Sequence, residues 1–347
     1  MKVLLFIPEK YTIAGTLIQG FTALGYEVIS IDYREYYAEW VSKIKRRTSK
    51  LNNKLKENID DLYIKKINNK HLEKYLSHDP VDIVLIYNHE LFLPETIRKI
   101  KHRSKVIFYL ADSPYYSPGN DYSLTILKDA DLIASPDTFW NKQISSLGFK
   151  NVIFSILGYD KVKNYKYKPT KEEYGKYSND VVFIGTNYKS SWGYKRAHFL
   201  NQFSDLDLKI YAHGPSWKTW RNQFPVLEKS IEFRTGRMSY VELNTILNCC
   251  KIYPVDANPG LLNGLHIRIF DCIASGILPV IEYREDLNTV FNGLEIPVIK
   301  NYKYAKRIAN YYLKDENKRV NVIKSLKEFI EDKYSPEKSI KHLISKL

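Results

Sequence analysis

The chain has 347 residues, 44% of them hydrophobic and 27% charged, which is typical of a globular protein with two domains of ordinary size. No apolar run approaches the roughly 18 residues that span a bilayer, and the first one ends at Pro8 and Glu9, too early for a signal peptide. The three cysteines match neither a disulfide framework nor a metal-ligand spacing, so we expect a cytoplasmic protein rather than a secreted, disulfide-rich or membrane-spanning one.

The first half of the chain alternates strand and helix signals. Its apolar runs are nearly continuous, as in parallel strands that are covered on both faces. Strands are expected at residues 2–7, 27–32, 81–87, 105–110, 131–135 and 151–156. Helices are expected at residues 13–24, 94–101, 122–129 and 138–147. The pattern predicts a doubly wound, Rossmann-like α/β domain over residues 1–165.

A basic helical insertion is predicted at about residues 34–77. Much of the net charge of +14 lies between Lys43 and Lys74, a stretch without Gly or Pro. Apolar residues recur there at helical spacing and predict one packed stripe: Ile44, Leu51, Leu55, Ile59 and Leu62. The simpler interpretation is a solvated helix. The alternative is a platform for an anionic acceptor or for the anionic inner face of a membrane.

The second half repeats the alternation after a polar, Lys- and Tyr-rich stretch at 163–179, which is typical of an interdomain linker. Strands are expected at residues 180–184, 208–212, 230–234, 251–255 and 277–281. Helices are expected to begin near Tyr194, Ser239 and Gly264. We predict a second Rossmann-like domain over 179–315 and an amphipathic, basic helical segment over 316–347.

The segment from Asn263 to Gly276 carries the most informative pattern. Asn263 is a suitable N-cap and Gly276 a suitable left-handed C-cap, so a helix is expected between them. Two faces follow from the spacing: Leu265, Ile269, Cys272 and Ile273 on a core face, and Arg268, Asp271 and Ser275 on another. Such a helix start attracts anions, and an arginine beside it neutralises a diphosphate while a carboxylate binds ribose. The alternative is a surface helix with an ordinary Arg–Asp pair.

This segment resembles the motif G-x-N/T-x-R-x-F-E-x-x-A-x-G of CgeB-like (spore-maturation-type) group 1 glycosyltransferases. The matching residues are Gly264, His266, Arg268, Phe270, Asp271, Ala274 and Gly276. The resemblance extends to residues 180–185, 238–244, 252–256, 285–287 and 291. The family usually has Glu in place of Asp271 and Asn or Thr in place of His266.

The resemblance implies the GT-B fold, with two Rossmann-like domains facing each other across a cleft and C-terminal helices that cross back to the first domain. The nucleotide-sugar donor would then bind the second domain, where ligands sit at the carboxyl ends of the strands. The predicted donor-binding residues are Gly185, Asn187, His213, Lys218, Arg221, Asn263, Gly264, His266, Arg268 and Asp271. Lys218 and Arg221 are candidates for the positive charge that a leaving diphosphate needs, although a packed surface loop explains them as well.

The acceptor would bind the first domain, where two strand ends carry ionisable residues. An inverting sugar transfer needs a general base, and Asp112, His89 and Glu90 are the candidates. Asp112 ranks first because it aligns with the acidic residue of a D-D/S-P turn in the family. The alternative for Asp112 is a structural aspartate that forms the turn before Ser113 and Pro114.

Two Asp-x-Asp triplets, at residues 129–131 and 205–207, precede strands instead of ending them. A metal-bound diphosphate would need them at the other edge, so we predict turn residues and no obligatory metal or other cofactor.

The sequence therefore predicts a metal-independent hexosyltransferase that moves a sugar from a nucleoside-diphosphate sugar, with UDP favoured, to a glycan, lipid-linked or protein hydroxyl in bacterial surface glycan synthesis. A nucleotide-sugar epimerase or hydrolase of the same shape is the nearest alternative. A basic nucleic-acid-binding protein is the other, but no recognition helix or aromatic RNA-binding signature is present, so no nucleic-acid partner is expected.

Overall fold

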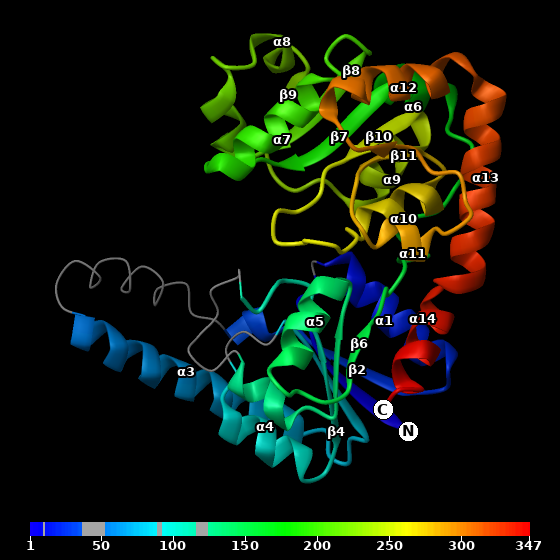
Figure 1. Cartoon of the computed structure of the whole chain (residues 1–347). Coiled ribbons are helices and arrows are strands. Elements are labelled where there is room, and N and C mark those ends of the chain that lie inside the picture. The colour runs from blue at the N-terminus through cyan, green and yellow to red at the C-terminus, as the bar shows by residue number, and fades with distance from the viewer. Residues whose placement is uncertain (10, 37–52, 89–91, 116–123) are drawn as a thin grey trace. The chain divides into compact units, whose positions relative to one another are not determined.

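The computed structural model describes residues 1–9, 11–36, 53–88, 92–115 and 124–347, and for 53–60 the backbone alone. The chain divides into two compact units (Figure 1). Unit 1 consists of Met1–Leu157 together with Pro336–Leu347, and unit 2 consists of Gly158–Ser335.

Unit 1 is built on a six-stranded parallel sheet in the order β2-β1-β3-β4-β5-β6. Its strands are β1 (Lys2–Phe6), β2 (Glu27–Ile31), β3 (Ile83–Tyr87), β4 (Lys105–Tyr109), β5 (Leu132–Ser135) and β6 (Val152–Phe154). Its helices are α1 (Thr12–Ala23), η1 (Tyr33–Tyr36), α3 (Asn53–Leu76), α4 (Pro94–Lys101), η2 (Thr125–Asp129), α5 (Thr138–Ser146) and α14 (Pro336–Ile344). Every residue of β3 is buried, because helices cover both faces of a parallel sheet.

Helix α14 closes unit 1 by packing on α1. The two helices approach so closely at Gly20 that a Cβ there would lie 2.3 Å from Ile340 Cγ1. The final segment 316–347 forms two helices, α13 (Glu316–Lys333) and α14, with a break before Pro336. Of the two, only α14 belongs to unit 1.

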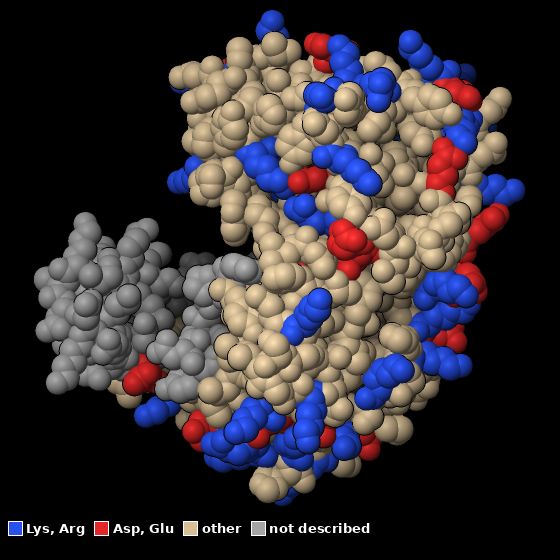
Figure 2. Space-filling view, viewed as in Figure 1, with Lys and Arg blue, Asp and Glu red and all other residues tan. Residues whose placement is uncertain are grey.

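Helix α3 corrects the predicted packed stripe at Leu62, the one stripe residue whose side chain is described. Its buried residues include Ile64, Ile67, His71 and Tyr75, spaced three and four apart, whereas Leu62 is 69% exposed. Two residues before Ile64 correspond to about 200° of helix rotation, so Leu62 points away from the core. Residues 37–52 of the predicted insertion lie outside the described residues. In Figure 2, basic side chains gather on unit 1 around α4.

Unit 2 is built on a second six-stranded parallel sheet, in the order β12-β11-β10-β7-β8-β9. Its strands are β7 (Val181–Thr186), β8 (Leu208–His213), β9 (Ile231–Arg234), β10 (Ile252–Val255), β11 (Leu278–Glu282) and β12 (Val298–Ile299). Its helices are α6 (Lys171–Tyr177), α7 (Ser191–Asn201), η3 (Pro215–Trp220), α8 (Pro225–Glu228), α9 (Tyr240–Cys249), α10 (Arg268–Ser275), α11 (Leu287–Val290), η4 (Tyr302–Tyr304), α12 (Ala305–Lys314) and α13 (Glu316–Lys333).

The stretch 163–179, which the sequence suggests as a linker, is instead an ordered part of unit 2. Asn244 of α9 exchanges two hydrogen bonds with the backbone of Tyr165, of 3.2 and 3.0 Å. Asn248 donates to the Tyr165 carbonyl and accepts from the Tyr167 amide, at 2.9 and 3.0 Å. Helix α6 follows, with a capping box at Thr170 and Glu173. Buried asparagine side chains therefore hold a segment whose composition alone is typical of a loop.

The α/β fold class predicted from the sequence is confirmed, and every predicted strand is present to within about two residues. Strand order reverses between β1 and β3 in unit 1 and between β7 and β10 in unit 2. Ligands of open parallel sheets bind outside the carboxyl ends of the strands at such switch points. These two edges are therefore where a functional site is expected.

Candidate functional site

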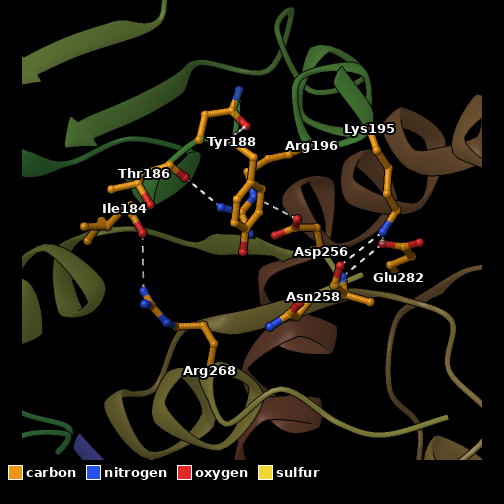
Figure 3. A network of polar contacts seen from close by, with 12 residues as sticks. Ile184, Thr186, Tyr188, Lys195, Arg196, Asp256, Asn258, Arg268 and Glu282 are labelled. Carbon is orange, nitrogen blue, oxygen red and sulfur yellow. Dashed lines mark hydrogen bonds and ion pairs between the residues drawn. The ribbon is translucent and has the colours of Figure 1, made fainter. Parts of the chain in front are cut away.

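The carboxyl edge of the unit 2 sheet carries a network of charged side chains (Figure 3). Arg196 of α7 donates from Nε to Asp256 Oδ2 at 2.8 Å and from Nη1 to the Thr186 carbonyl at 2.6 Å. Asp256 follows β10 and Thr186 ends β7, so Arg196 bridges the two strands of the switch point. Both ionised groups are buried, and their pairing offsets the cost of removing them from water.

Lys195, the neighbour of Arg196, makes a second link at the same edge. Its Nζ donates to Glu282 Oε2 at 2.6 Å and to the Ala257 carbonyl at 3.1 Å. Glu282 ends β11 and also accepts from the Ala257 amide at 2.9 Å and from the Tyr302 hydroxyl at 2.9 Å. These contacts fix the loop after β10. Lys195 and Glu282 neutralise each other's charge.

Arg268, the first residue of α10, lies at the switch point with a different set of partners. Its Nη1 donates to the Tyr253 hydroxyl at 2.9 Å and reaches the Ile184 carbonyl at 3.5 Å. In the described part of the chain no carboxylate lies within ion-pair distance of its guanidinium. A half-buried guanidinium that is oriented by neutral groups keeps its charge available to an anion.

His266 adds a neutral donor beside Arg268. Its Nδ1 accepts a hydrogen bond from the Arg268 amide at 3.0 Å, which places the ring proton on Nε2. Burial, together with the positive charges of Arg268 and Arg196, lowers the pKa of His266 to about 3. The imidazole is therefore uncharged near neutral pH, and the proximity of two guanidinium groups marks this edge as electropositive.

The start of α10 corrects the sequence interpretation. The helix begins at Arg268, and its N-cap position is Ile267, which makes no side-chain capping bond. Asn263 and Gly264 lie in the irregular segment before it, where the Asn263 carbonyl accepts from the Asp286 amide at 3.1 Å. Gly276 ends the helix in the left-handed conformation, as predicted. The predicted anion-binding helix start at Asn263 and Gly264 is thus absent from the described structure.

Asp271 and Ser275 correct the prediction of an exposed chemical face. All residues of α10 after Arg268 are buried. Asp271 Oδ1 accepts from Asn164 Nδ2 at 3.0 Å, and the Ser275 hydroxyl donates to Asn244 Oδ1 at 2.9 Å. The pKa of Asp271 is raised to about 7, mainly by burial and further by the charge of Asp160, against the opposing effect of Arg268. The Asp271 carboxylate is therefore bound to Asn164, in the segment that begins unit 2. Among the described residues no ion pair joins it to Arg268.

This burial predicts a measurable pH effect. The pKa of Asp271 is about 7 in the folded state against an ordinary 3.8, so the folded chain binds this proton more tightly and loses stability as pH rises from about 4 to 7. Asp271→Asn keeps an acceptor for Asn164 and should raise the free energy of unfolding at pH 8, by about 4 kcal/mol at most. Urea unfolding at pH 5 to 8 measures it. Asp205→Asn, at an exposed position, is the control and should keep the wild-type pH dependence. The assignment would be contradicted if the free energy of unfolding of Asp271→Asn varied with pH as it does in wild type.

Asn187 follows β7 at the same edge. It is 5% exposed, and its Oδ1 accepts from the Tyr188 amide at 2.8 Å. Its buried Nδ2 has no hydrogen-bond partner among the residues described, which is a costly state for a buried donor in the absence of a ligand or a water molecule. The carbonyl of Gly185 is already bound by Trp217 Nε1 at 2.9 Å.

The remaining predicted donor residues lie further along the edge. His213 ends β8 and is partly exposed, and Arg221 follows η3 on the surface. Lys218 is exposed and its Nζ lies 5.3 Å from the centroid of the Phe233 ring. No contact between described residues joins these three side chains to the network of Figure 3.

In unit 1, Asp112 follows β4 at the carboxyl edge. Asn88 Nδ2 donates to Asp112 Oδ2 at 2.7 Å, and Asn88 Oδ1 accepts from the amides of Ala111 and Asp112 at 2.7 and 3.1 Å. Asn88 adopts a left-handed backbone with φ of 47°, which asparagine tolerates better than most residues. Burial raises the pKa of Asp112, and the Asn88 hydrogen bond partly opposes that shift. His89 and Glu90, the other predicted bases, lie outside the described residues.

The Asp-x-Asp triplets have structural partners at the amino ends of the strands. Asp131 accepts from the Val106 amide at 2.9 Å, and Asp129 Oδ2 lies 3.8 Å from Arg98 Nη1. Asp205 pairs with Lys306 at 2.7 Å, and Asp207 accepts from the Asp180 amide at 3.1 Å. Across the described ranges no group of three or more His, Cys, Asp or Glu side chains is arranged to hold a metal ion.

The described ranges also contain no helix with the length and apolar character to cross a membrane.

Sequence reasoning missed several residues of these edges. Tyr253 alternates with buried apolar residues inside β10 and carries no motif signal, and Arg196 and Lys195 are basic residues of an ordinary helix. Asp256 follows one buried strand and Glu282 ends another, and that position is the signal that would have identified them. Asn88 also follows a strand, next to the predicted His89.

Two six-stranded parallel sheets with interleaved helices define the GT-B fold, and solved GT-B structures match the chain over nearly its whole length. HepE from Anabaena, solved in complex with UDP and glucose, has 12% identity and a TM-score of 0.61, with 100% of both chains covered. Sucrose-phosphate synthase from Thermosynechococcus elongatus has 10% identity and a TM-score of 0.65, covering 99% of this chain and 97% of the other. A putative UDP-N-acetylglucosamine 2-epimerase from Listeria monocytogenes has 10% identity and a TM-score of 0.58, covering 99% and 95%.

The family comparison concerns the second half of the chain. Residues 195–345 match the model of a family described as glycosyl transferase-like, a range that contains Arg196, Asp256 and the whole of α10. None of the curated proteins searched matches the chain. The chain therefore has the GT-B fold and carries a glycosyl transferase-like region. The narrower CgeB-like subgroup stays a prediction from the sequence.

Proposed function

We propose that the protein is a glycosyltransferase that moves a sugar from a nucleoside-diphosphate sugar, with UDP as the favoured carrier, to a hydroxyl acceptor. The observation that carries the proposal is Arg268. It is oriented by Tyr253 and Ile184 at the switch point of unit 2 and has no carboxylate partner among the described residues. A leaving diphosphate needs such a preorganised charge, and the glycosyl transferase-like match covers this position.

Unit 2 supplies donor-binding groups beyond Arg268. His266 Nε2–H is a neutral donor that stays neutral because its pKa is about 3, and Asn187 Nδ2 is a buried donor whose partner is missing among the described residues. Together with Arg268 they provide the charge and hydrogen-bond donors that phosphate oxygens accept. Because arginine supplies the charge, we propose that transfer needs no divalent metal. The expected result is full activity in the presence of EDTA, and loss of activity that Mn²⁺ restores would contradict it.

Unit 1 supplies the general base, Asp112. In an inverting transfer the acceptor oxygen attacks the anomeric carbon, Asp112 accepts the hydroxyl proton, and the diphosphate leaves with the electron pair of the broken bond. Asn88 orients the carboxylate, and the raised pKa of Asp112 makes it a stronger base than an exposed aspartate. The basic surface around α4 supports peripheral contact with an anionic membrane, and a bacterial surface glycan is the product class that we propose.

Thermal unfolding with nucleotides tests the donor assignment. UDP should raise the melting temperature more than GDP, ADP or dTDP at equal concentration, because a ligand that binds only the folded state adds about 2.7 kcal/mol at 100 times its dissociation constant. Sugar-nucleotide consumption should then depend on an added acceptor. Failure of all four nucleotides to shift the transition would overturn the proposal, and rapid donor conversion without acceptor would favour an epimerase or hydrolase.

A further inference from the structure

The carboxyl edge of the unit 1 sheet carries aromatic and polar side chains on four adjacent strands. In spatial order the strands are β2, β1, β3 and β4. Asp32 and Arg34 follow β2, and Tyr11 follows β1. Tyr87 ends β3 and is followed by Asn88, and Asp112 lies after β4. The switch point of this sheet lies between β1 and β3, so Tyr11 and Tyr87 stand on its two sides.

Tyr11 presents an exposed and braced aromatic ring at this edge. The ring is 38% exposed, and its centroid lies 5.4 Å from that of Tyr87. The Arg34 guanidinium lies 5.9 Å from the Tyr11 centroid, and Arg34 is itself held by Asp32 through Nε and Nη2. An exposed ring that is oriented by two neighbours costs little entropy when a ligand packs on it.

Tyr87 adds a hydroxyl group that faces the Asp112 charge. Tyr87 is 8% exposed, and within the described residues its hydroxyl makes no hydrogen bond. Burial raises the pKa of Tyr87 well above its ordinary value, and Asp112 and Tyr11 raise it further. The phenol therefore stays protonated. A phenol hydroxyl without a partner at a switch point is available to donate to a ligand.

The chemistry of this edge fits a sugar ring better than a peptide or an acyl chain. A pyranose has an apolar C–H face and a rim of hydroxyls, so it needs both an aromatic surface and closely placed hydrogen-bonding groups. Tyr11 provides the surface. Asp112, whose Oδ1 has no partner in the described chain, can accept from a sugar hydroxyl, and the Tyr87 hydroxyl can donate to one.

We propose that the carboxyl edge of unit 1 binds a carbohydrate ring, with Tyr11 packed on its C–H face and with Tyr87 and Asp112 bound to its hydroxyls. The inference rests on the proposed function in one respect, because it makes that sugar the acceptor. The acceptor class is then a glycan hydroxyl, free or lipid-linked, and not a protein side chain.

Saturation-transfer difference NMR on the full chain tests the binding without any donor. The probes are the methyl glycosides of glucose, galactose, mannose and N-acetylglucosamine. At least one should receive saturation, mainly at its ring C–H protons. Tyr11→Ala should reduce the signal at least about 5-fold, because the stacking surface is lost, and Tyr11→Phe should retain it. Tyr311→Ala, a tyrosine of α12 that is 55% exposed, is the control and should match wild type.

Two results would overturn the proposal: no saturation transfer to any of the four glycosides, or an undiminished signal in folded Tyr11→Ala. Kinetics then separate it from the proposed function. Tyr11→Ala should raise the KM for the sugar acceptor by about 10-fold, with a much smaller change in the KM for the donor, and Tyr87→Phe should do so to a lesser extent. If no nucleotide sugar is ever consumed but glycoside binding still depends on Tyr11, the proposed function fails while the carbohydrate site stands.

Discussion

Arg268→Ala is expected to lower kcat/KM for the donor by roughly 100- to 1,000-fold, the usual effect of removing one preorganised group that stabilises developing negative charge. The chain should stay folded, because Tyr253 keeps its own hydrogen bond of 3.0 Å to the Ile184 carbonyl. Steady-state transfer assays and UDP-induced thermal shifts measure the effect, and both should weaken together. Arg268→Lys should recover part of the activity, since lysine keeps the charge but not the planar pair of donors.

Arg307→Ala is the matched control for this experiment. Arg307 is an exposed arginine of α12 whose guanidinium lies 4.7 Å from the centroid of the Tyr304 ring, and we place it in no functional role. Its removal changes the net charge of unit 2 by the same amount. Equal losses in the two variants would mean that the net charge matters and not the position, and wild-type turnover by Arg268→Ala would remove the residue from the donor site.

Asp112→Asn is expected to lower kcat by roughly 100- to 10,000-fold, the contribution typical of a general base. The amide keeps an oxygen that accepts from Asn88, so the turn should be preserved. Wild-type kcat/KM should fall as pH falls through the Asp112 pKa, because only the carboxylate form accepts a proton. Burial raises that pKa above its ordinary 3.8, so the loss begins at a higher pH than for an exposed aspartate. The variant should lack this acid limb.

The same substitution separates the catalytic role of Asp112 from a structural one. Asparagine forms turns as readily as aspartate, so a purely turn-forming Asp112 would leave Asp112→Asn fully active. Asp129→Asn, which removes a carboxylate at the opposite edge of the sheet, is the control and should retain wild-type kcat and the wild-type pH profile. Persistence of the acid limb in Asp112→Asn would assign that limb to another group.

The fold was largely readable from the sequence because its determinants are local. Parallel strands buried on both faces leave continuous apolar runs, such as Ile83–Tyr87, and helix ends leave caps such as Ser239 and Gly276. Strand β12 was missed because two residues, Val298 and Ile299, are too few for a pattern. The stretch 163–179 was misread because its order comes from α9, through Asn244 and Asn248, and not from its own composition.

By itself the sequence determined two parallel α/β units and an arginine at the carboxyl edge of the second, because periodicity and strand ends are local properties of the chain. Only the tertiary structure decided what each polar residue is free to do. Asp256 and Glu282 are neutralised by Arg196 and Lys195, and Asp271 is buried against Asn164. Arg268 keeps its charge because its partners among the described residues are neutral. Partners far apart in the sequence set these charges, so no local pattern could reveal them.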